Sequence, residues 1–196
     1  NEHIAVLKSD GTIYEWGRIY ETKSPIPPDL KDVSSIFAHF KNTFCIKKNG
    51  SVVRCGPNYG TPEKEILSLK DVVEISGNIV LKKDGTVVPW EVDRFNVSVI
   101  PSGLSGVKSI KQGLHFAVAL KEDGTVVTWG SNEHGETTIP SGVNNIKAIE
   151  AGPYHTLALK SDGTVLAWGA NFQGQLNVPS DLNNVIAIAA GESHSV

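Results

Sequence analysis

The sequence has no methionine, only two cysteines among its 196 residues and only three arginines. No apolar run approaches the roughly 18 to 20 residues that a bilayer-spanning helix needs, so a membrane span is not indicated. The formal net charge is −3 and the basic residues are scattered, which argues against nucleic acid as a partner. The 40% hydrophobic and 20% charged residues are instead typical of a folded globular protein.

A turn dipeptide recurs along the whole chain. Asp-Gly, or once Asn-Gly, occurs at intervals of 39, 35, 39 and 39 residues, with the acidic or amide residue at Asp10, Asn49, Asp84, Asp123 and Asp162. The flanking residues alternate in hydrophobicity, which predicts a β-hairpin around each turn. An isoleucine follows each turn residue by 26 positions, at Ile36, Ile75, Ile110, Ile149 and Ile188, which predicts a further apolar strand in every repeat.

Four short strands in each unit of about 39 residues, without helical periodicity, predict an all-β fold of the β-propeller type. We expect a single propeller domain over residues 1–196, with repeats centred on the five turns and a last partial repeat from residue 185. The number of blades stays open. Either the termini close five blades into a ring, or the chain is a segment of a six- to seven-bladed ring.

The four tryptophans occupy one register, six residues after the turn residue: Trp16, Trp90, Trp129 and Trp168. Cys55 stands at the fifth such position. We expect these residues to pack between blades rather than to form a sugar-stacking platform. Cys45 also lies at a core register. A disulfide between Cys45 and Cys55 is expected to be unfavourable, because the two residues would face opposite sides of a hairpin or lie diagonally across it.

The histidines and acidic residues do not form a recognisable catalytic or metal motif. His3, His155 and His194 share a register with Asn42 and Phe116, which indicates a packing role. No histidine has a second ligand at metal spacing, and no nucleophile motif or phosphate-binding glycine loop is present. We therefore expect no enzyme activity, no metal site and no cofactor.

The third repeat is shorter than the others. Asp84 follows Ile75 by nine residues, whereas the corresponding interval in the other three complete repeats is 13 residues. The Ser76-Gly77-Asn78 connection should therefore be tight, and this blade should lack part of one face.

The residues from Ala151 to Gln175, Ala-Gly-Pro-Tyr-His-Thr-Leu-Ala-Leu-Lys-Ser-Asp-Gly-Thr-Val-Leu-Ala-Trp-Gly-Ala-Asn-Phe-Gln-Gly-Gln, resemble the repeat of the regulator of chromosome condensation superfamily. The resemblance covers the whole chain and is closest in residues 107–196. The 39-residue spacing is similar to that of the compact bacterial branch, which includes a type of beta-lactamase inhibitory protein. The resemblance implies a seven-bladed propeller that acts through protein contacts, such as nucleotide exchange on a small GTPase, chromatin binding or enzyme inhibition.

The part of each unit that does not repeat is the best candidate for binding a partner. In a propeller, the loops after the first and third strands emerge on the same face, and here they carry aromatic and amide side chains suited to protein recognition. The candidate residues are Phe40, Lys41, Asn58, Tyr59, His115, Asn132, Glu133, His134, Tyr154, Asn171, Phe172 and Gln173. We expect a non-catalytic scaffold that binds another protein and can inhibit it. The alternatives are an exchange factor for a small GTPase and a lectin-like propeller, with carbohydrate the less favoured ligand.

Overall fold

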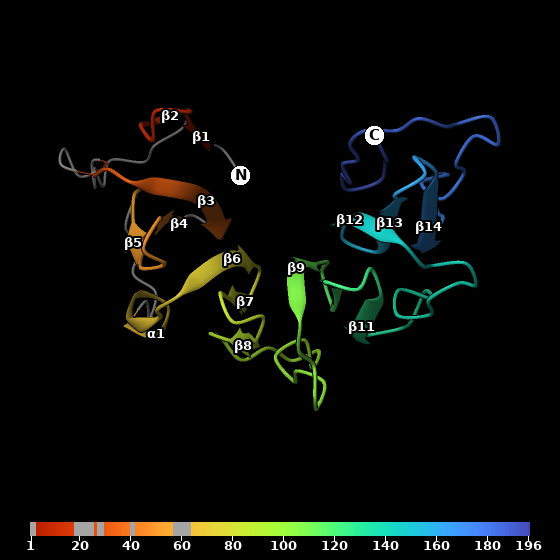
Figure 1. Ribbon diagram of the computed structural model, residues 1–196, viewed down its shortest axis with the longest axis horizontal. Helices are drawn as coiled ribbons and strands as arrows, with labels where there is room; N and C mark the ends of the chain where they lie inside the picture. Colours follow the sequence, from red (N-terminus) through yellow and green to blue (C-terminus); the bar gives the residue numbers. More distant parts are fainter. Residues whose placement is uncertain (1–2, 18–25, 27–29, 40–41, 57–63) are drawn as a thin grey trace. The chain divides into compact units, whose positions relative to one another are not determined.

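The computed structural model describes residues 3–17, 26, 30–39, 42–56 and 64–196 (Figure 1). In chain order its elements are β1 (His3–Leu7), β2 (Ile13–Gly17), β3 (Val33–His39), β4 (Asn42–Lys47), β5 (Val52–Arg54), α1 (Lys64–Ser68), β6 (Val72–Ser76), β7 (Ile79–Lys82), β8 (Val87–Pro89), β9 (Val107–Gln112), β10 (Phe116–Lys121), β11 (Val126–Gly130), β12 (Ile146–Ala151), β13 (His155–Lys160) and β14 (Val165–Gly169). The predicted hairpins and the apolar strands that contain Ile36, Ile75, Ile110 and Ile149 are confirmed, whereas the strand expected around Ile188 is not formed. The short helix α1, anchored by the buried Ile66, was not predicted from the sequence.

The strands form small antiparallel sheets, ordered β1-β2, β3-β4-β5, β6-β7-β8, β9-β10-β11 and β12-β13-β14. The expected fourth strand of each blade is wrong for the described residues, because no sheet among them has more than three strands. In the fourth repeat this outer segment is irregular and contains Pro140, which lacks a backbone donor. It is held instead by a side-chain bond, in which Thr128 Oγ1 donates to the Thr137 carbonyl at 3.0 Å.

The chain divides into two compact units, residues 1–75 and 76–196. The division falls in β6, at the start of the short third-repeat connection. Residues 76–196 contain two complete repeats, β9 to β11 and β12 to β14, together with the residues that follow them. Whether residues 1–196 form one propeller domain stays a prediction.

Each Asp-Gly turn is a three-residue loop closed by the same bonds. In the fourth repeat, Lys121 N donates to the Thr125 carbonyl at 2.9 Å and Gly124 N donates to the Lys121 carbonyl at 3.0 Å. Gly124 has a φ of 80°, a left-handed conformation that favours glycine. Asp123 Oδ1 accepts bonds from the backbone N and the Oγ1 of Thr125, at 2.9 and 2.6 Å. The prediction that these aspartates form turns is confirmed.

The turn glycine also binds the next repeat. Its carbonyl accepts a bond from the same register of the next repeat, at 3.2 Å from Ile146 N to Gly124 O and at 3.0 Å from Val185 N to Gly163 O. The same bond joins Val72 N to Gly50 O at 2.9 Å. A side chain on Gly124 would bring its Cβ within 3.3 Å of Ile146 N. Glycine is thus needed both for the turn and for the close approach of the next strand.

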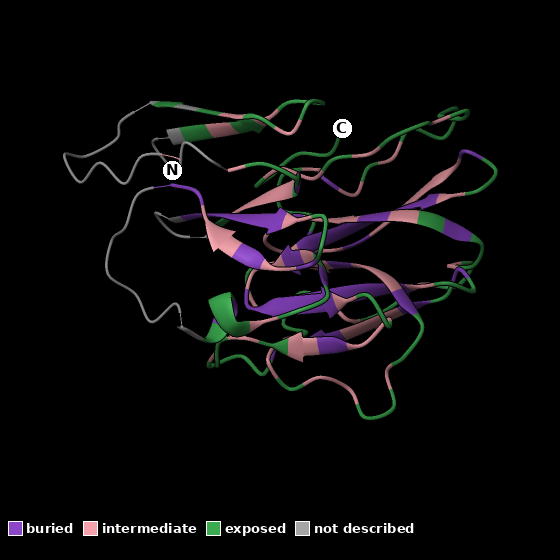
Figure 2. Cartoon of the chain, turned by 60° about the vertical axis from the view of Figure 1, so that its left-hand side comes forward, coloured by how far each residue is buried: buried purple, intermediate pink, exposed green. Residues whose placement is uncertain are grey.

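The core of residues 76–196 lies between successive sheets (Figure 2). One cluster joins β7, β9 and β10 to Trp129 of β11, and a second joins β10, β12 and β13 to Trp168 of β14. Trp129 and Trp168 are 8% and 4% exposed. Their Nε1 atoms donate to the carbonyls of Val97 and Glu136, at 2.8 and 3.0 Å. The predicted packing role is confirmed for these two tryptophans, whereas Trp16 is 51% exposed.

The expectation against a disulfide is wrong, because Cys45 and Cys55 are bonded to each other. Cys45 faces Val53 in the β4-β5 ladder, and Cys55 N donates to the Thr43 carbonyl at 3.0 Å, so the two cysteines are diagonal neighbours. Their Cα atoms are 5.8 Å apart. This separation is within disulfide range because the twist of a hairpin shortens one of its diagonals. The cysteines take the registers of Ala119 and Trp129, which pack in one cluster in the fourth repeat.

The predicted tight connection in the third repeat is confirmed. Only Gly77 and Asn78 separate β6 from β7. Asn78 N donates to Gln112 Oε1 and Gln112 N donates to Ser76 Oγ, both at 2.9 Å. The Gln112 side chain lies so close to Gly77 that a Cβ there would clash with it. The side chain of Gln112, from the next repeat, therefore occupies the space beside the shortened loop.

Candidate binding surface

The loops after the first and third strands emerge at one end of the sheets in residues 76–196, opposite to the Asp-Gly turns. Residues 113–115 join β9 to β10, and residues 152–154 join β12 to β13. The segments that follow β8, β11 and β14 begin at the same end, because successive strands are antiparallel. A backbone bond of 2.8 Å from Leu114 N to the Pro153 carbonyl ties the two first-strand loops together.

Three of the predicted residues meet in this region. The His134 ring contacts the Phe172 ring edge-on, with centroids 4.9 Å apart, and the Tyr154 ring at 6.0 Å. His134 comes from the segment after β11, Tyr154 from the loop before β13 and Phe172 from the segment after β14. Phe172 is 65% exposed, so this cluster is not core packing.

A second aromatic pair includes a residue that the sequence analysis missed. Phe95 stacks on His115, with ring centroids 3.4 Å apart, and Phe95 is 45% exposed. Phe95 precedes His134 by 39 residues, and His115 precedes Tyr154 by 39 residues. Rings therefore meet at the same two registers in successive repeats, stacked in the first case and edge-on in the second. This spacing was the signal that could have identified Phe95. We refer to Phe95, Leu114, His115, His134, Tyr154 and Phe172 as the ring surface.

Hydrogen bonds within each loop hold the ring surface in place. Asn132 Oδ1 accepts a bond from Thr137 N at 2.9 Å, and a buried Glu136 carboxylate accepts one from His134 N at 2.8 Å. The fifth repeat has the same arrangement, in which Asn171 Oδ1 accepts from Leu176 N at 2.9 Å and Gln175 Oε1 accepts from Gln173 N at 2.8 Å. Asn132 and Asn171 were predicted to contact a partner, and their amide oxygens here bond within the loops.

Asp93, at the register of Asn132 and Asn171, holds the loop that carries Phe95. The Asp93 carboxylate accepts bonds from the backbone N atoms of Phe95, Val97 and Ser98 and from Asn78 Nδ2. Burial opposes ionisation of Asp93, but the backbone bonds outweigh it and lower the pKa of this carboxyl group. The loop presents two further apolar side chains, Val92 at 88% and Val99 at 63% exposure.

The other predicted site residues are distributed as follows. Glu133 and Gln173 are exposed beside the rings. Four lie outside the described residues: Phe40, Lys41, Asn58 and Tyr59. The structure thus brings together His134, Tyr154 and Phe172, and pairs His115 with the unpredicted Phe95.

One serine and one histidine approach each other, but their bonds are structural. Ser195 Oγ lies 3.3 Å from His155 Nε2 and donates to the Gln175 carbonyl at 2.8 Å. His155 is fully buried beside Gly152, which has no Cβ to collide with the ring. Burial and the neighbouring His194 lower the pKa of His155. The predicted packing role is confirmed for His155. Among the residues described, no three metal-ligating side chains come together, and no helix is long enough to cross a membrane.

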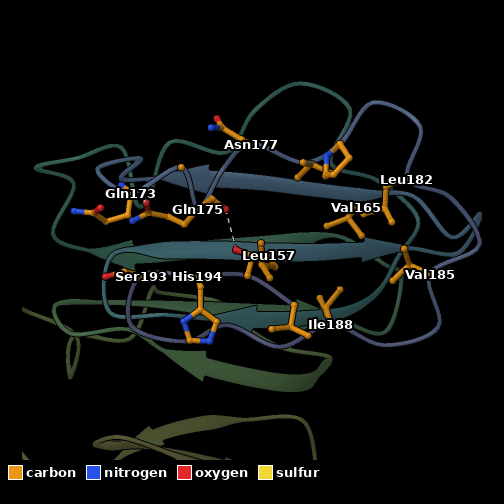
Figure 3. A pocket seen from close by; sticks show the side chains of 15 residues that line it. Leu157, Val165, Gln173, Gln175, Asn177, Leu182, Val185, Ile188, Ser193 and His194 are labelled. Carbon is orange, nitrogen blue, oxygen red and sulfur yellow. Dashed lines mark hydrogen bonds between the residues drawn. The ribbon is translucent and has the colours of Figure 1, made fainter.

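A cavity of about 350 Å³ lies beside the last partial repeat, and the predicted site residue Gln173 is among the residues that line it (Figure 3). Its apolar wall includes Leu157, Val165, Val185 and Ile188. The last three share registers with Val126, Ile146 and Ile149, which belong to the cluster that packs between sheets one repeat earlier. The wall is therefore made of core positions of the repeat, and we assign no ligand to it.

Comparison with known proteins agrees with the repeat and its geometry. The family model described as the regulator of chromosome condensation (RCC1) repeat matches residues 107–136 and 146–175. Two of the repeats of this chain thus match the RCC1 repeat. The matched segments contain His115, His134, Tyr154 and Phe172, whereas Phe95 lies before the first of them. The assignment to the compact bacterial branch stays a prediction.

Solved structures support the propeller fold. The chain is 17% identical to Prp20p from Saccharomyces cerevisiae, with a TM-score of 0.75 over 99% of this chain and 66% of that one. For yeast RCC1 (Prp20) bound to Kap60, the identity is 19% and the TM-score is 0.72, over 100% of this chain and 65% of that one. For the ectodomain of the Physcomitrella patens receptor kinase CR4, the identity is 20% and the TM-score is 0.70, over 98% of this chain and 55% of that one. The chain thus spans about two thirds or less of these three chains. No curated protein matches it.

Proposed function

We propose that the protein is a non-catalytic propeller scaffold that binds another protein through the ring surface. The observation that carries this proposal is the exposed cluster of His134, Tyr154 and Phe172, held on loops with internal hydrogen bonds. Rigid aromatic side chains bury a large area and lose little conformational entropy on binding, so they suit a protein interface. In this proposal Leu114, 49% exposed, adds apolar area between the loops.

The comparisons support the same class of function. Prp20p is described by its binding to Gsp1p and histones, and yeast RCC1 has been solved bound to Kap60. These partners belong to those proteins. What supports the proposal here is that these two similar propellers are described with protein partners, together with an exposed aromatic surface on this chain.

The test is affinity capture from an extract of the source organism with three forms of the immobilised chain: the unmodified chain, a Phe95→Ala/His134→Ala/Phe172→Ala variant and a Tyr14→Ala/Val73→Ala control. The control removes exposed apolar side chains that do not belong to the ring surface. We expect a protein retained by the unmodified chain and the control, with retention by the triple variant reduced roughly tenfold or more. Equal retention by all three forms would contradict the proposal.

Inhibition of the bound protein is the narrower form of this proposal. A scaffold whose aromatic side chains cover the active site of an enzyme would block its substrate. If the captured protein is an enzyme, its rate should fall as the unmodified chain is added and recover when the triple variant replaces it. An unchanged rate would remove inhibition and leave binding.

A further inference from the structure

The ring surface has a pair of contacting rings at the same two registers of successive repeats. In the first copy Phe95 stacks on His115 with 26° between the ring planes, and in the second His134 meets Tyr154 edge-on at 76°. Corresponding rings are 39 residues apart, which is the repeat length. In each copy the first ring follows the third strand of one repeat, and the second ring precedes the second strand of the next repeat. We call these the first and second ring pairs.

The two ring pairs belong to a continuous part of the surface. The loops that carry His115 and Tyr154 are hydrogen-bonded to each other, from Leu114 N to the Pro153 carbonyl at 2.8 Å. The half-exposed Leu114 side chain comes from the same loop as His115. Phe172 extends the second ring pair through its contact with His134. A single binding segment can therefore contact both pairs.

The exposed residues that directly precede Phe95 and His134 carry opposite charges, and the Asp93 carboxylate next to the first of them is bonded to backbone N atoms of its own loop. Arg94 directly precedes Phe95, and Glu133 directly precedes His134, so both occupy the same register of the repeat. Both side chains are exposed, and within the part of the chain that the structure describes neither forms an ion pair. Nearby, Lys111 and Glu150 neutralise each other at 3.4 Å. The surface thus has a positive group at the first ring pair and a negative group at the second.

Building on the proposed protein-binding function, we infer that the partner presents an extended peptide segment across two successive repeats. One apolar or aromatic side chain of the segment contacts each ring pair, an acidic side chain faces Arg94 and a basic side chain faces Glu133. An extended segment offers side chains at regular intervals, which suits a surface that has a ring pair at the same registers of successive repeats. The opposite charges fix the direction of the segment, since the reversed orientation would place like charges together.

The probe is a phage-displayed library of random 12-residue peptides selected on the whole chain. We expect enriched peptides to carry two apolar residues, with an acidic residue near one end and a basic residue near the other. Selection on an Arg94→Glu/Glu133→Arg variant should enrich peptides with the opposite order of charges. The same order of charges on both forms would overturn the predicted orientation.

The affinity of the strongest peptide then tests the two-pair contact. Phe95→Ala and His134→Ala should each weaken binding roughly tenfold, and the double variant should weaken it further, while Tyr14→Ala should have no effect. A loss confined to one of the two variants would overturn the two-pair inference and leave the proposed function standing. If no peptide is enriched while the extract experiment retains a protein, the inference also fails. If Phe95→Ala and His134→Ala leave peptide binding unchanged and the triple variant retains the extract protein as well as the unmodified chain does, both proposals fail.

Discussion

The two ends of the strands in residues 76–196 differ in what they conserve from repeat to repeat. At one end each repeat has the same three-residue turn, with an aspartate bonded to threonine and a glycine bonded to the next repeat. At the other end the loops differ in the side chains they expose and, in the third repeat, in length. The turn end joins one repeat to the next through its glycine, so its chemistry must recur. The loop end joins repeats through a backbone bond from Leu114 N to the Pro153 carbonyl, so its exposed side chains are free to vary and can carry recognition.

Removing a buried core side chain should give the largest loss of stability among these predictions. Trp168→Ala removes a buried side chain and its bond to the Glu136 carbonyl, and should lower the free energy of unfolding by about 3–5 kcal/mol. Trp16→Ala, at the same register but half exposed, should cost under about 1 kcal/mol. Urea unfolding followed by circular dichroism measures both. Equal losses would show that register alone, and not burial, sets the role of the tryptophans.

The disulfide should give the next largest effect. Cys45→Ala/Cys55→Ala opens a bridge between residues ten positions apart and should cost about 2–3 kcal/mol of unfolding free energy. In the second repeat this bridge occupies the registers where the fourth repeat has Ala119 and Trp129. Unfolding in urea, with a reducing agent added to the unmodified chain as a second condition, measures the loss. An unchanged stability would mean that packing, not the bond, holds this repeat.

The turn glycines should show that the link to the next repeat matters beyond the turn itself. Gly124→Ala and Gly142→Ala both place alanine at a positive φ, near 80° and 86°. Only at Gly124 does the new Cβ meet the backbone of the following strand, whereas nothing lies within 4 Å at Gly142. We expect losses of about 2 kcal/mol and about 1 kcal/mol respectively. Equal thermal shifts for the two variants would contradict the role assigned to the close approach.

Acid should weaken the turn end by a smaller amount. The Thr164 hydroxyl bond, with the Thr164 backbone N and Lys160, lowers the pKa of Asp162 to about 2, and Thr12 does the same for Asp10. A folded-state pKa below the ordinary 3.8 means that the carboxylate stabilises the fold above pH 4 and that this contribution is lost as the pH falls toward 2.

Asp162→Asn tests this pH dependence, because Asn49 already occupies the same turn position and accepts a bond from Ser51 N at 3.0 Å. The variant should be less stable than the unmodified chain at pH 5 and equal to it near pH 2. Unfolding free energies at the two pH values measure the difference. A difference that stays constant from pH 5 to pH 2 would contradict the role of the carboxylate.

The sequence was sufficient to predict the parts of the fold that recur. The period of the turns located the hairpins around Asp123 and Asp162, and the shortened interval after Ile75 predicted the tight Gly77-Asn78 connection. The Cys45–Cys55 bond was missed because the Cα separation of a diagonal pair depends on hairpin twist, which residue spacing does not reveal. The prediction of a fourth strand was wrong because the outer segments are held by turns and side-chain bonds instead of the backbone bonds of a β-ladder.

The residues of the candidate site could be predicted only in part from the sequence. Loop position was enough to select His134, Tyr154 and Phe172, since antiparallel topology brings those loops together. Phe95 was missed because the third repeat has an aspartate, Asp93, at the register of Asn132 and Asn171, although all three accept a bond from the backbone N five residues further on. The internal bonds of those asparagines depend on loop conformation, which the sequence pattern does not determine.

The ring surface should contribute least to stability and most to binding. Phe95→Ala/His134→Ala removes exposed rings, so the free energy of unfolding should stay within about 0.5 kcal/mol of the unmodified chain. The central measurement is the affinity of this double variant for the peptide selected on the unmodified chain, by fluorescence anisotropy with Tyr14→Ala as control. We predict that the double variant loses roughly a hundredfold in affinity and the control loses none. An affinity equal to that of the unmodified chain, with the fold intact, would contradict the assignment of recognition to the loop end.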